Sequence, residues 1–306
     1  MSLIYYFEPK LKNPVLVAAW PGMGNVGLIA VENLRVQLQA EEFAEIKSWE
    51  FFYPNRVLIQ DGELKELIFP SNKFYYSHLP QQDIIIFIGY EQSMQEGRRY
   101  AEGEPAQRLA ETILEVAQKF ECNRIYTSGA AAEPIHHKDN PRVVVTATES
   151  YLIEEMIKYP NVISISQKRE TSTVVGLSGI LLGIAKNYGI EGVCLMGEIP
   201  LYLTEFVWSY PKASKSVLAV FSQILSVNLD LTVFDRKIIE IENKIEEFLR
   251  EIKEKLISET DIPESLINWL DWALSYQPEK VEPMSEQDKI NLFREIDDFL
   301  KKQKDK

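Results

Sequence analysis

A glycine-rich segment between a strand-like and a helix-like stretch is the part of the sequence best suited to bind a ligand. Residues 20–27 read WPGMGNVG, and Gly22, Gly24 and Gly27 follow the spacing G-x-G-x-x-G. In such a turn, backbone N–H groups and the positive end of the following helix can bind an anion. The ligand-binding residues that this pattern predicts are Gly22, Met23, Gly24 and Asn25.

The same segment has a simpler interpretation as a tight turn. A dinucleotide site would also need an acid at the end of the next strand, about 20 residues further on. Glu45 and Glu50 lie near that distance without a clear place at a strand end, and Pro21 is unusual within the fingerprint. The pattern therefore favours a turn that needs positive φ and close packing, with a bound anion or small ligand as the alternative.

Polar or glycine residues also follow three later strand-like stretches, at 83–88, 124–128 and 192–196. They are Gly89, Glu91, Gly129 and Glu198. If these strands are parallel, their carboxyl ends meet at one edge of the sheet, where open α/β folds bind ligands. Glu91 and Glu198 would then be candidates for an acidic pair. Short connecting loops are the alternative explanation for the same residues.

The remaining reactive side chains do not form a recognisable catalytic or metal-binding pattern. His136 and His137 are adjacent and would point in opposite directions in an extended segment. His78 and the two cysteines, Cys122 and Cys194, complete no zinc-ligand spacing. No P-loop is present, and residues 176–179 (GLSG) only approach a nucleophile elbow. The sequence predicts no catalytic residues, no metal and no cofactor.

The elements that would position these residues alternate between strands and helices. Apolar strand-like stretches lie at 15–20, 43–48, 83–88, 124–128, 142–147, 162–166 and 192–196. Helical periodicity marks 26–39, 106–120, 149–158, 176–188 and 213–226. Apolar strands separated by helices predict an α/β fold with a mainly parallel sheet covered on both faces.

A hairpin is predicted at residues 57–69. Two apolar stretches, 57–60 and 64–69, flank Asp61 and Gly62. Asp-Gly between apolar runs is typical of a two-residue β-turn, because both residues tolerate positive φ.

The composition changes near residue 235. Positions 235–306 contain 19 acidic and 13 basic residues, whereas the whole chain of 306 residues contains 46 and 33. The division predicts an α/β domain over 1–232 and a charged helical extension over 233–306. An apolar seam along the first helix of the extension comprises Ile238, Ile241, Ile245, Phe248 and Ile252. It is suited to an oligomer or partner contact, with packing against the chain's own body as the alternative. Further helices are predicted from Pro263 and from Ser285.

The net charge of −13 argues against a protein that holds nucleic acid through phosphate contacts. The N-terminal residues lack the basic and apolar regions of a secretory signal, and no stretch approaches the ~20 apolar residues that span a bilayer. The expectation is a cytoplasmic protein with neither nucleic acid nor membrane as a partner.

Three stretches are similar to the proteasome assembly chaperone family, the group named for the second assembly chaperone of the eukaryotic core particle. They are residues 20–34 (WPGMGNVGLIAVENL), residues 51–54 (FFYP) with 59–64 (IQDGEL), and residues 176–200 (GLSGILLGIAKNYGIEGVCLMGEIP). Members occur in archaea and bacteria. The resemblance implies a three-layer α/β/α sandwich around a mixed sheet, similar to the purine nucleoside phosphorylase fold, in a chain that assembles as a homo-oligomer.

The resemblance also implies a function. It points to a non-enzymatic chaperone or scaffold for proteasome-like or other protein complexes, with a nucleoside- or phosphate-type binding protein or enzyme as the alternative. Family members that dock on the proteasome α-ring tend to end in a hydrophobic-Tyr-any tripeptide. This sequence ends in Lys304, Asp305 and Lys306, so docking by that tail is not expected.

Overall fold

In the computed structural model of the chain, the described residues are 3–47, 51, 54, 56–91, 103–204, 206, 208–257 and 264–278. Within these ranges, nine strands form one mixed sheet. Their spatial order is β1 (Leu3–Tyr5), β3 (Glu41–Ile46), β6 (Asn72–Ser77), β7 (Ile84–Gly89), β2 (Val15–Ala19), β8 (Arg124–Glu133), β11 (Glu191–Pro200), β9 (Val143–Ala147) and β10 (Val162–Ser164).

The centre of the sheet is parallel and its flanks are antiparallel. Strands β7, β2, β8 and β11 run in the same direction. On one side β6 pairs antiparallel with β7, and on the other β9 pairs antiparallel with β11. The sequence pattern did not predict β1 or β6, which complete the antiparallel side of the sheet.

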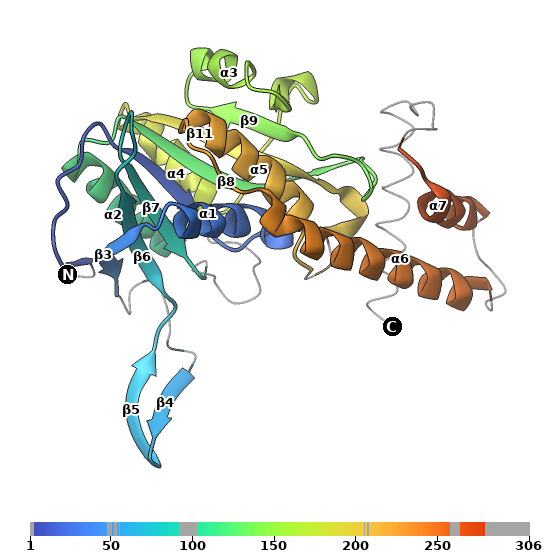
Figure 1. Ribbon diagram of the computed structural model, residues 1–306, viewed down its shortest axis with the longest axis horizontal. Coiled ribbons are helices and arrows are strands. Elements are labelled where there is room, and N and C mark those ends of the chain that lie inside the picture. The colour runs from blue at the N-terminus through green and yellow to red at the C-terminus, as the bar shows by residue number, and fades with distance from the viewer. Residues whose placement is uncertain are drawn as a thin grey trace.

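Helices cover both faces of the sheet (Figure 1). Helices α1 (Val26–Gln37), α3 (Ser150–Met156) and α5 (Pro211–Ile224) share one apolar cluster with one face. Helices α2 (Gly103–Lys119) and α4 (Leu177–Asn187) share a second cluster with the opposite face. The predicted three-layer α/β sandwich is confirmed.

The central strands are apolar on both faces because both faces are buried. In β2, Val15 and Val17 lie in the cluster beneath α1 and α5, whereas Leu16 and Ala18 lie in the cluster beneath α2 and α4. Continuous burial explains why this strand reads as an unbroken apolar run rather than as an alternating one.

Two strands are longer than the sequence pattern predicted. Gly129 and Glu198 were expected in loops, but they lie inside the ten-residue strands β8 and β11. Glycine, alanine and glutamate are weak strand formers, so the local composition did not predict the extension. The ladder between β8 and β11, continuous from Arg124 to Glu133, sets the length instead.

The predicted hairpin forms β4 (Arg56–Gln60) and β5 (Glu63–Ile68), a separate two-stranded sheet. Asp61 and Gly62 have φ values of 54° and 81°, as the two-residue turn requires. Figure 1 shows that this hairpin projects away from the nine-stranded sheet.

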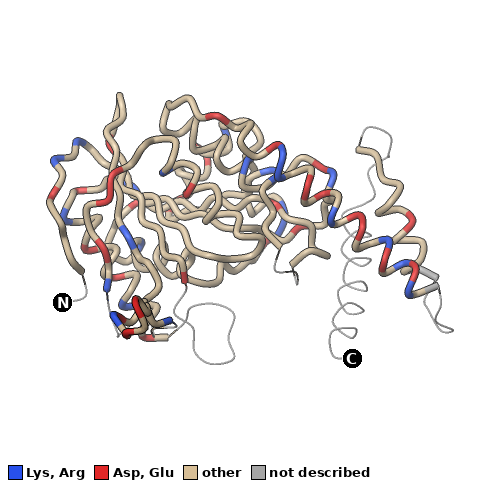
Figure 2. Tube along the Cα trace, turned by 60° about the horizontal axis from the view of Figure 1, so that its bottom comes forward, with Lys and Arg blue, Asp and Glu red and all other residues tan. Residues whose placement is uncertain are grey.

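The charged extension begins with α6 (Asp235–Ile257) and continues with α7 (Glu264–Ser275). Acidic and basic residues alternate along α6 (Figure 2), whereas the sequence of α7 contains two acidic residues and no basic residue. The apolar side chains of α6 pack into the same hydrophobic cluster as those of α1 and α5, so the extension shares the core of the body. The helix predicted from Ser285 lies outside the described residues. Every helix in the described ranges is too short or too polar to cross a bilayer.

Candidate functional site

The glycine-rich turn is held tightly by its neighbours. Gly24 has a φ of 58°, and the N–H of Tyr210 donates to its carbonyl oxygen at 2.7 Å. A Cβ atom at Gly27 would lie 2.4 Å from the carbonyl oxygen of Ser128 in β8. Only glycine permits this approach of α1 to the strand. The interpretation of the segment as a closely packed turn is confirmed.

The turn has a small enclosed cavity beneath Gly24 and open space at Gly22. Beneath Gly24, a cavity of ≈ 10 Å³ is lined by residues that include Trp208, Tyr210 and Ile245, which is about the room of one water molecule. At Gly22, by contrast, a Cβ atom would meet nothing within 4 Å. Asn25 caps α1 without a side-chain hydrogen bond. The open side of the turn faces the carboxyl ends of the central strands.

At this place β8 continues beyond its neighbour β2. The ladder between β2 and β8 ends at Thr127, but the ladder between β8 and β11 continues to Glu133. All four residues from Gly129 to Ala132 are partly exposed. The second half of β8 therefore has a strand on one side and none on the other.

Two hydrogen bonds show which backbone groups line the unpaired edge. The N–H of Val15 donates to Asp83, on the β7 side of β2, and the N–H of Glu198 donates to Arg142, on the β9 side of β11. Because successive residues of a strand direct their N–H and C=O groups to opposite neighbours, the residues of β11 that face β8 are odd-numbered. Gly197 lies opposite Ala130, and in a parallel ladder it hydrogen-bonds to the residues on either side of Ala130, which are Gly129 and Ala131. Ala130 and Ala132 therefore direct their backbone groups to the unpaired edge.

Some of these groups have side-chain partners. The carbonyl of Ser128 accepts from Ser178 Oγ at 3.3 Å, and the carbonyl of Ala132 accepts from Arg169 Nη2 at 3.2 Å. The N–H and C=O of Ala130 and the N–H of Ala132 have no hydrogen-bond partner among the described residues. Unpaired backbone groups in the middle of a sheet are uncommon, because burying them without a partner costs free energy.

A cluster of five charged residues lies at the far end of this edge. Lys168 Nζ lies 3.0 Å from a carboxylate oxygen of Glu133 and 2.9 Å from one of Glu198. Arg142 pairs with Glu198 at 3.0 Å, and Arg169 pairs with Glu133 at 2.9 Å. Lys168 thus bridges the two carboxylates, and an arginine pairs with each of them.

Glu198 is held as an anion by its partners. Burial of Glu198 acts to raise its pKa, but the hydrogen bonds from Arg142 and Lys168 outweigh burial and lower the pKa below its usual value. A buried carboxylate with such partners stabilises the local structure and is not positioned as a proton donor at neutral pH.

The structure separates the predicted acidic pair. Glu198 lies in β11, whereas Glu91 follows β7, and the strands β2 and β8 lie between them. Three strand spacings of ~4.8 Å correspond to about 14 Å. The pairing of Glu91 with Glu198 is therefore wrong, because the sequence pattern did not specify the order of the strands between them.

Gly89 serves packing at the end of β7. A Cβ atom at this position would lie 2.6 Å from Trp20 Nε1 and 2.8 Å from Asn72 Oδ1. These two buried polar atoms have no hydrogen-bond partner among the described residues. Gly89 leaves room for the Trp20 ring, and the structure assigns it no ligand contact.

The predicted seam of α6 is buried inside the chain itself. Ile241 and Ile245 belong to the main core, together with Leu249 and Leu256, which the sequence pattern left out. Phe248 packs against the rings of Phe206 and Trp208. Ile238 and Ile252 are partly buried against the same core. The seam is therefore not free to contact a second subunit, because the body of the chain covers it.

The adjacent histidines join α7 to the body. His136 Nε2 lies 2.9 Å from the carbonyl oxygen of Ala273, and its ring stacks on Tyr276 at 4.1 Å. His137 Nδ1 lies 2.6 Å from the hydroxyl of Tyr202. Burial lowers the pKa of His136 to about 4 and that of His137 to about 2. Both rings are neutral at pH 7, and the described residues contain no metal-ligand cluster.

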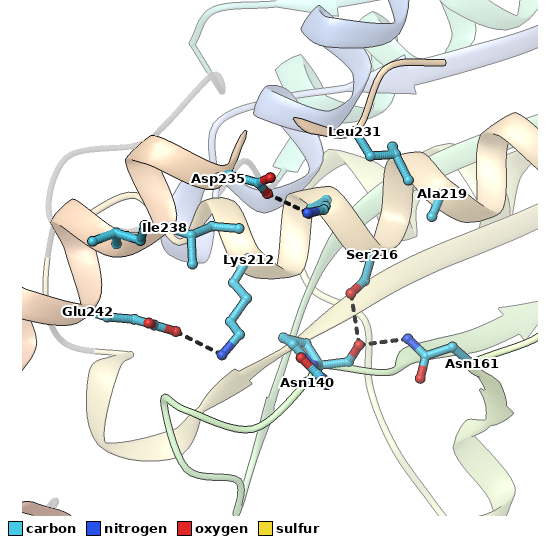
Figure 3. A pocket seen from close by; sticks show the side chains of 12 residues that line it. Asn140, Asn161, Lys212, Ser216, Ala219, Leu231, Asp235, Ile238 and Glu242 are labelled. Carbon is cyan, nitrogen blue, oxygen red and sulfur yellow. Dashed lines mark hydrogen bonds and ion pairs between the residues drawn. The ribbon is translucent and has the colours of Figure 1, made fainter. Parts of the chain in front are cut away.

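A groove of ≈ 660 Å³ separates α5 from α6. Figure 3 shows Lys212 directed at Glu242, while Ser216 and Asn161 converge on the carbonyl of Pro141. These polar side chains satisfy one another across the groove. The sequence pattern missed this groove and the edge of β8, since each is built from segments far apart in the chain. Only the run of small residues at 129–132 marked the edge.

Comparisons with known proteins identify what the chain resembles. The model of the PAC2 family matches residues 16–249. An archaeal proteasome activator, PbaB of Pyrococcus furiosus, is 30% identical with a TM-score of 0.68, over 82% of this chain and 98% of that one. An archaeal homologue of a proteasome-assembly chaperone, PbaA of the same organism, shares the fold at 21% identity and a TM-score of 0.58, over 84% and 93% of the two chains.

A curated relative extends the match to another archaeon. The uncharacterized protein MJ1210 of Methanocaldococcus jannaschii is 28% identical over 246 residues, which is 80% of this chain and 85% of that protein. The matched region includes the first half of α6, so the predicted division at residues 232 and 233 is not a boundary of the family match.

Proposed function

The chain belongs to the PAC2 family, and from this premise we propose that it is a non-enzymatic assembly factor for a proteasome-type protein complex. The similarity to PbaB, described as an archaeal proteasome activator, supports a role with proteasome subunits. We also propose that the chain works as a homo-oligomer, as the resemblance implies.

The observation that carries the proposal is the projecting hairpin of β4 and β5. Val57 lies opposite Leu67, and Ile59 lies opposite Leu64. Val57 and Ile59 share a face because they are two apart on a strand, and directly opposite residues lie on the same face. An irregularity in the pairing between Leu58 and Ile59 places Leu64 and Leu67, three residues apart, opposite these two residues, so all four apolar side chains lie on one face. Their exposed fractions are between 44% and 75%.

An isolated hairpin is only marginally stable in water, and an exposed apolar face marks a site for protein contacts. The arm formed by β4 and β5 extends beyond the body and exposes such a face, so contact with another protein would also stabilise it. We assign this arm to contact with subunits of the assembling complex.

Binding to archaeal core-particle subunits tests the proposal. The chain is mixed with separate α- and β-subunits, and complexes are followed by native mass spectrometry and by the peptidase activity that appears on assembly. We expect the chain to bind the subunits and to change the yield of active particle. A folded chain that neither binds nor changes that yield would contradict the proposal.

Variants of the hairpin locate the contact. Ile59→Ser combined with Leu64→Ser removes two members of the apolar face and should weaken binding by at least ~10-fold. Leu58→Ser alters the opposite face of the same strand and serves as the matched control. Equal loss in both variants would place the contact elsewhere. Light scattering of the free chain reports its oligomeric mass in parallel.

A further inference from the structure

We propose that the unpaired edge of β8 binds the C-terminal end of another polypeptide in an extended conformation. This inference uses the end of β8 near the glycine-rich turn, and it does not depend on the hairpin or on the proposed function. It rests on three features: unpaired backbone groups, small side chains beside them, and a cation where the edge ends.

The backbone groups determine the kind of ligand. Ala130 presents an N–H and a C=O, and Ala132 presents an N–H, all on the side of β8 where β2 has ended. Donor and acceptor alternate along this edge with the spacing of a strand. An extended peptide backbone matches that pattern, as in other cases of strand addition to a free edge.

The surroundings leave room for a backbone to approach. Residues 129–132 are glycine and three alanines. A Cβ atom at Gly129 would have only Met196 Cγ within 4 Å, at 4.0 Å, and one at Gly22 would have no neighbour. The side chains on the faces of the sheet beside this edge are therefore small, and the space above Gly129 is open to the side chains of an added strand.

The ends of the edge determine the length of the ligand. Ser178 Oγ already donates to the carbonyl of Ser128, and Arg169 Nη2 already donates to the carbonyl of Ala132. Between these two points the free groups can pair with two or three residues of a peptide, at ~3.3 Å per residue. A short chain end fits this length better than a long internal segment.

Arg169 determines the chemistry of that end. Its side chain is 48% exposed, and its hydrogen bonds to Ala132 and Glu133 use one of its terminal nitrogens. A guanidinium has five N–H donors in a planar fork suited to a carboxylate. A free C-terminal carboxylate at the end of the edge would accept hydrogen bonds from the remaining donors of Arg169.

Hydrogen exchange of the free protein tests whether the edge is open. The amides of Gly129 and Ala131 bond to β11, whereas those of Ala130 and Ala132 face the edge. We expect slow exchange at Gly129 and Ala131 and faster exchange at Ala130 and Ala132. Equal protection at all four positions would show that the edge is already occupied, and would overturn the proposal.

Binding is then measured with a defined pool of peptides. The pool contains acetylated tetrapeptides with Val, Ile, Thr, Phe or Ser at each position and a free C-terminal carboxylate. We expect some members to be retained by the protein and to slow exchange at Ala130. Retention should fall by ~10-fold or more when the same peptides end in an amide, because a charge-assisted hydrogen bond is lost.

Variants separate the role of Arg169 from a general loss of charge. Arg169→Gln should weaken retention by ~10-fold, and Arg169→Lys should restore part of it. Arg236→Gln, on the exposed surface of α6, should leave retention unchanged. The proposal fails if no peptide is retained at 0.1 mM protein, with ~0.1 mM as the weakest affinity expected of a short ligand, or if amide and carboxylate peptides bind equally.

Discussion

Truncation of Ile245 tests whether α6 is part of the folded body. Ile245 is fully buried in the cluster that contains α1 and α5, and it lines the small cavity beneath Gly24. Ile245→Ala removes three carbon atoms, each worth about 0.8 kcal/mol of transfer free energy. The enlarged cavity adds to this loss, so we expect a decrease of about 3–4 kcal/mol in the free energy of unfolding.

Equilibrium unfolding in urea measures this loss. Ile239→Ala is the matched control, because Ile239 lies on the same helix and is 59% exposed. It should change the free energy of unfolding by less than about 0.5 kcal/mol. Both variants are compared with the unmodified chain over a 100-fold range of protein concentration.

Two outcomes would refute the placement of Ile245. A loss below about 1 kcal/mol would show that the residue is not in a packed core. If the difference in the free energy of unfolding between the variant and the unmodified chain grows with protein concentration, Ile245 contacts a second subunit, since association couples stability to concentration. A contact within the chain gives a difference in this free energy that is independent of concentration.

Two further predictions concern the turn and the histidines. Gly27→Ala should lower the melting temperature strongly, because its Cβ would lie 2.4 Å from the carbonyl of Ser128, whereas Gly22→Ala, which has open space, should not. Burial lowers the pKa of His136 from 6.5 to about 4 and that of His137 from 6.5 to about 2. As the pH falls below 6.5, these histidines therefore take up protons in the unfolded chain before they do so in the folded chain. The melting temperature should be independent of these groups above about pH 6.5 and should fall toward pH 4, with a shallower fall in His136→Gln. A melting temperature that does not change over this range would contradict the prediction.

Local patterns predicted the elements whose geometry depends on adjacent residues. The turn at Gly24 and the hairpin turn at Asp61 and Gly62 have positive φ angles, and glycine and aspartate are residue types that adopt such angles readily, so the sequence predicted both turns. The periodicity of α6 placed Ile241 and Ile245 on one apolar face, because helical spacing is a local property. What covers that face is not a local property, so the pattern left both a partner and the chain's own body open, and in the structure the body covers it.

The acidic pair failed for a related reason. Glu91 and Glu198 each follow or lie within an apolar strand, but the strand order that separates them depends on pairing between distant segments. The length of β8 beyond β2 also depends on its ladder with β11, to which glycine and alanine contribute little local preference.

The sequence by itself determined the layered α/β architecture, the glycine turn, the hairpin and the charged helical extension, because apolar periodicity and turn chemistry act over a few residues. Only the tertiary structure decided that the turn packs against Ser128 and Tyr210, that α6 is buried in its own chain, and that the edge beside Ala130 is unpaired. Each of these depends on which distant segments meet, and burial and strand pairing set that choice over the whole chain.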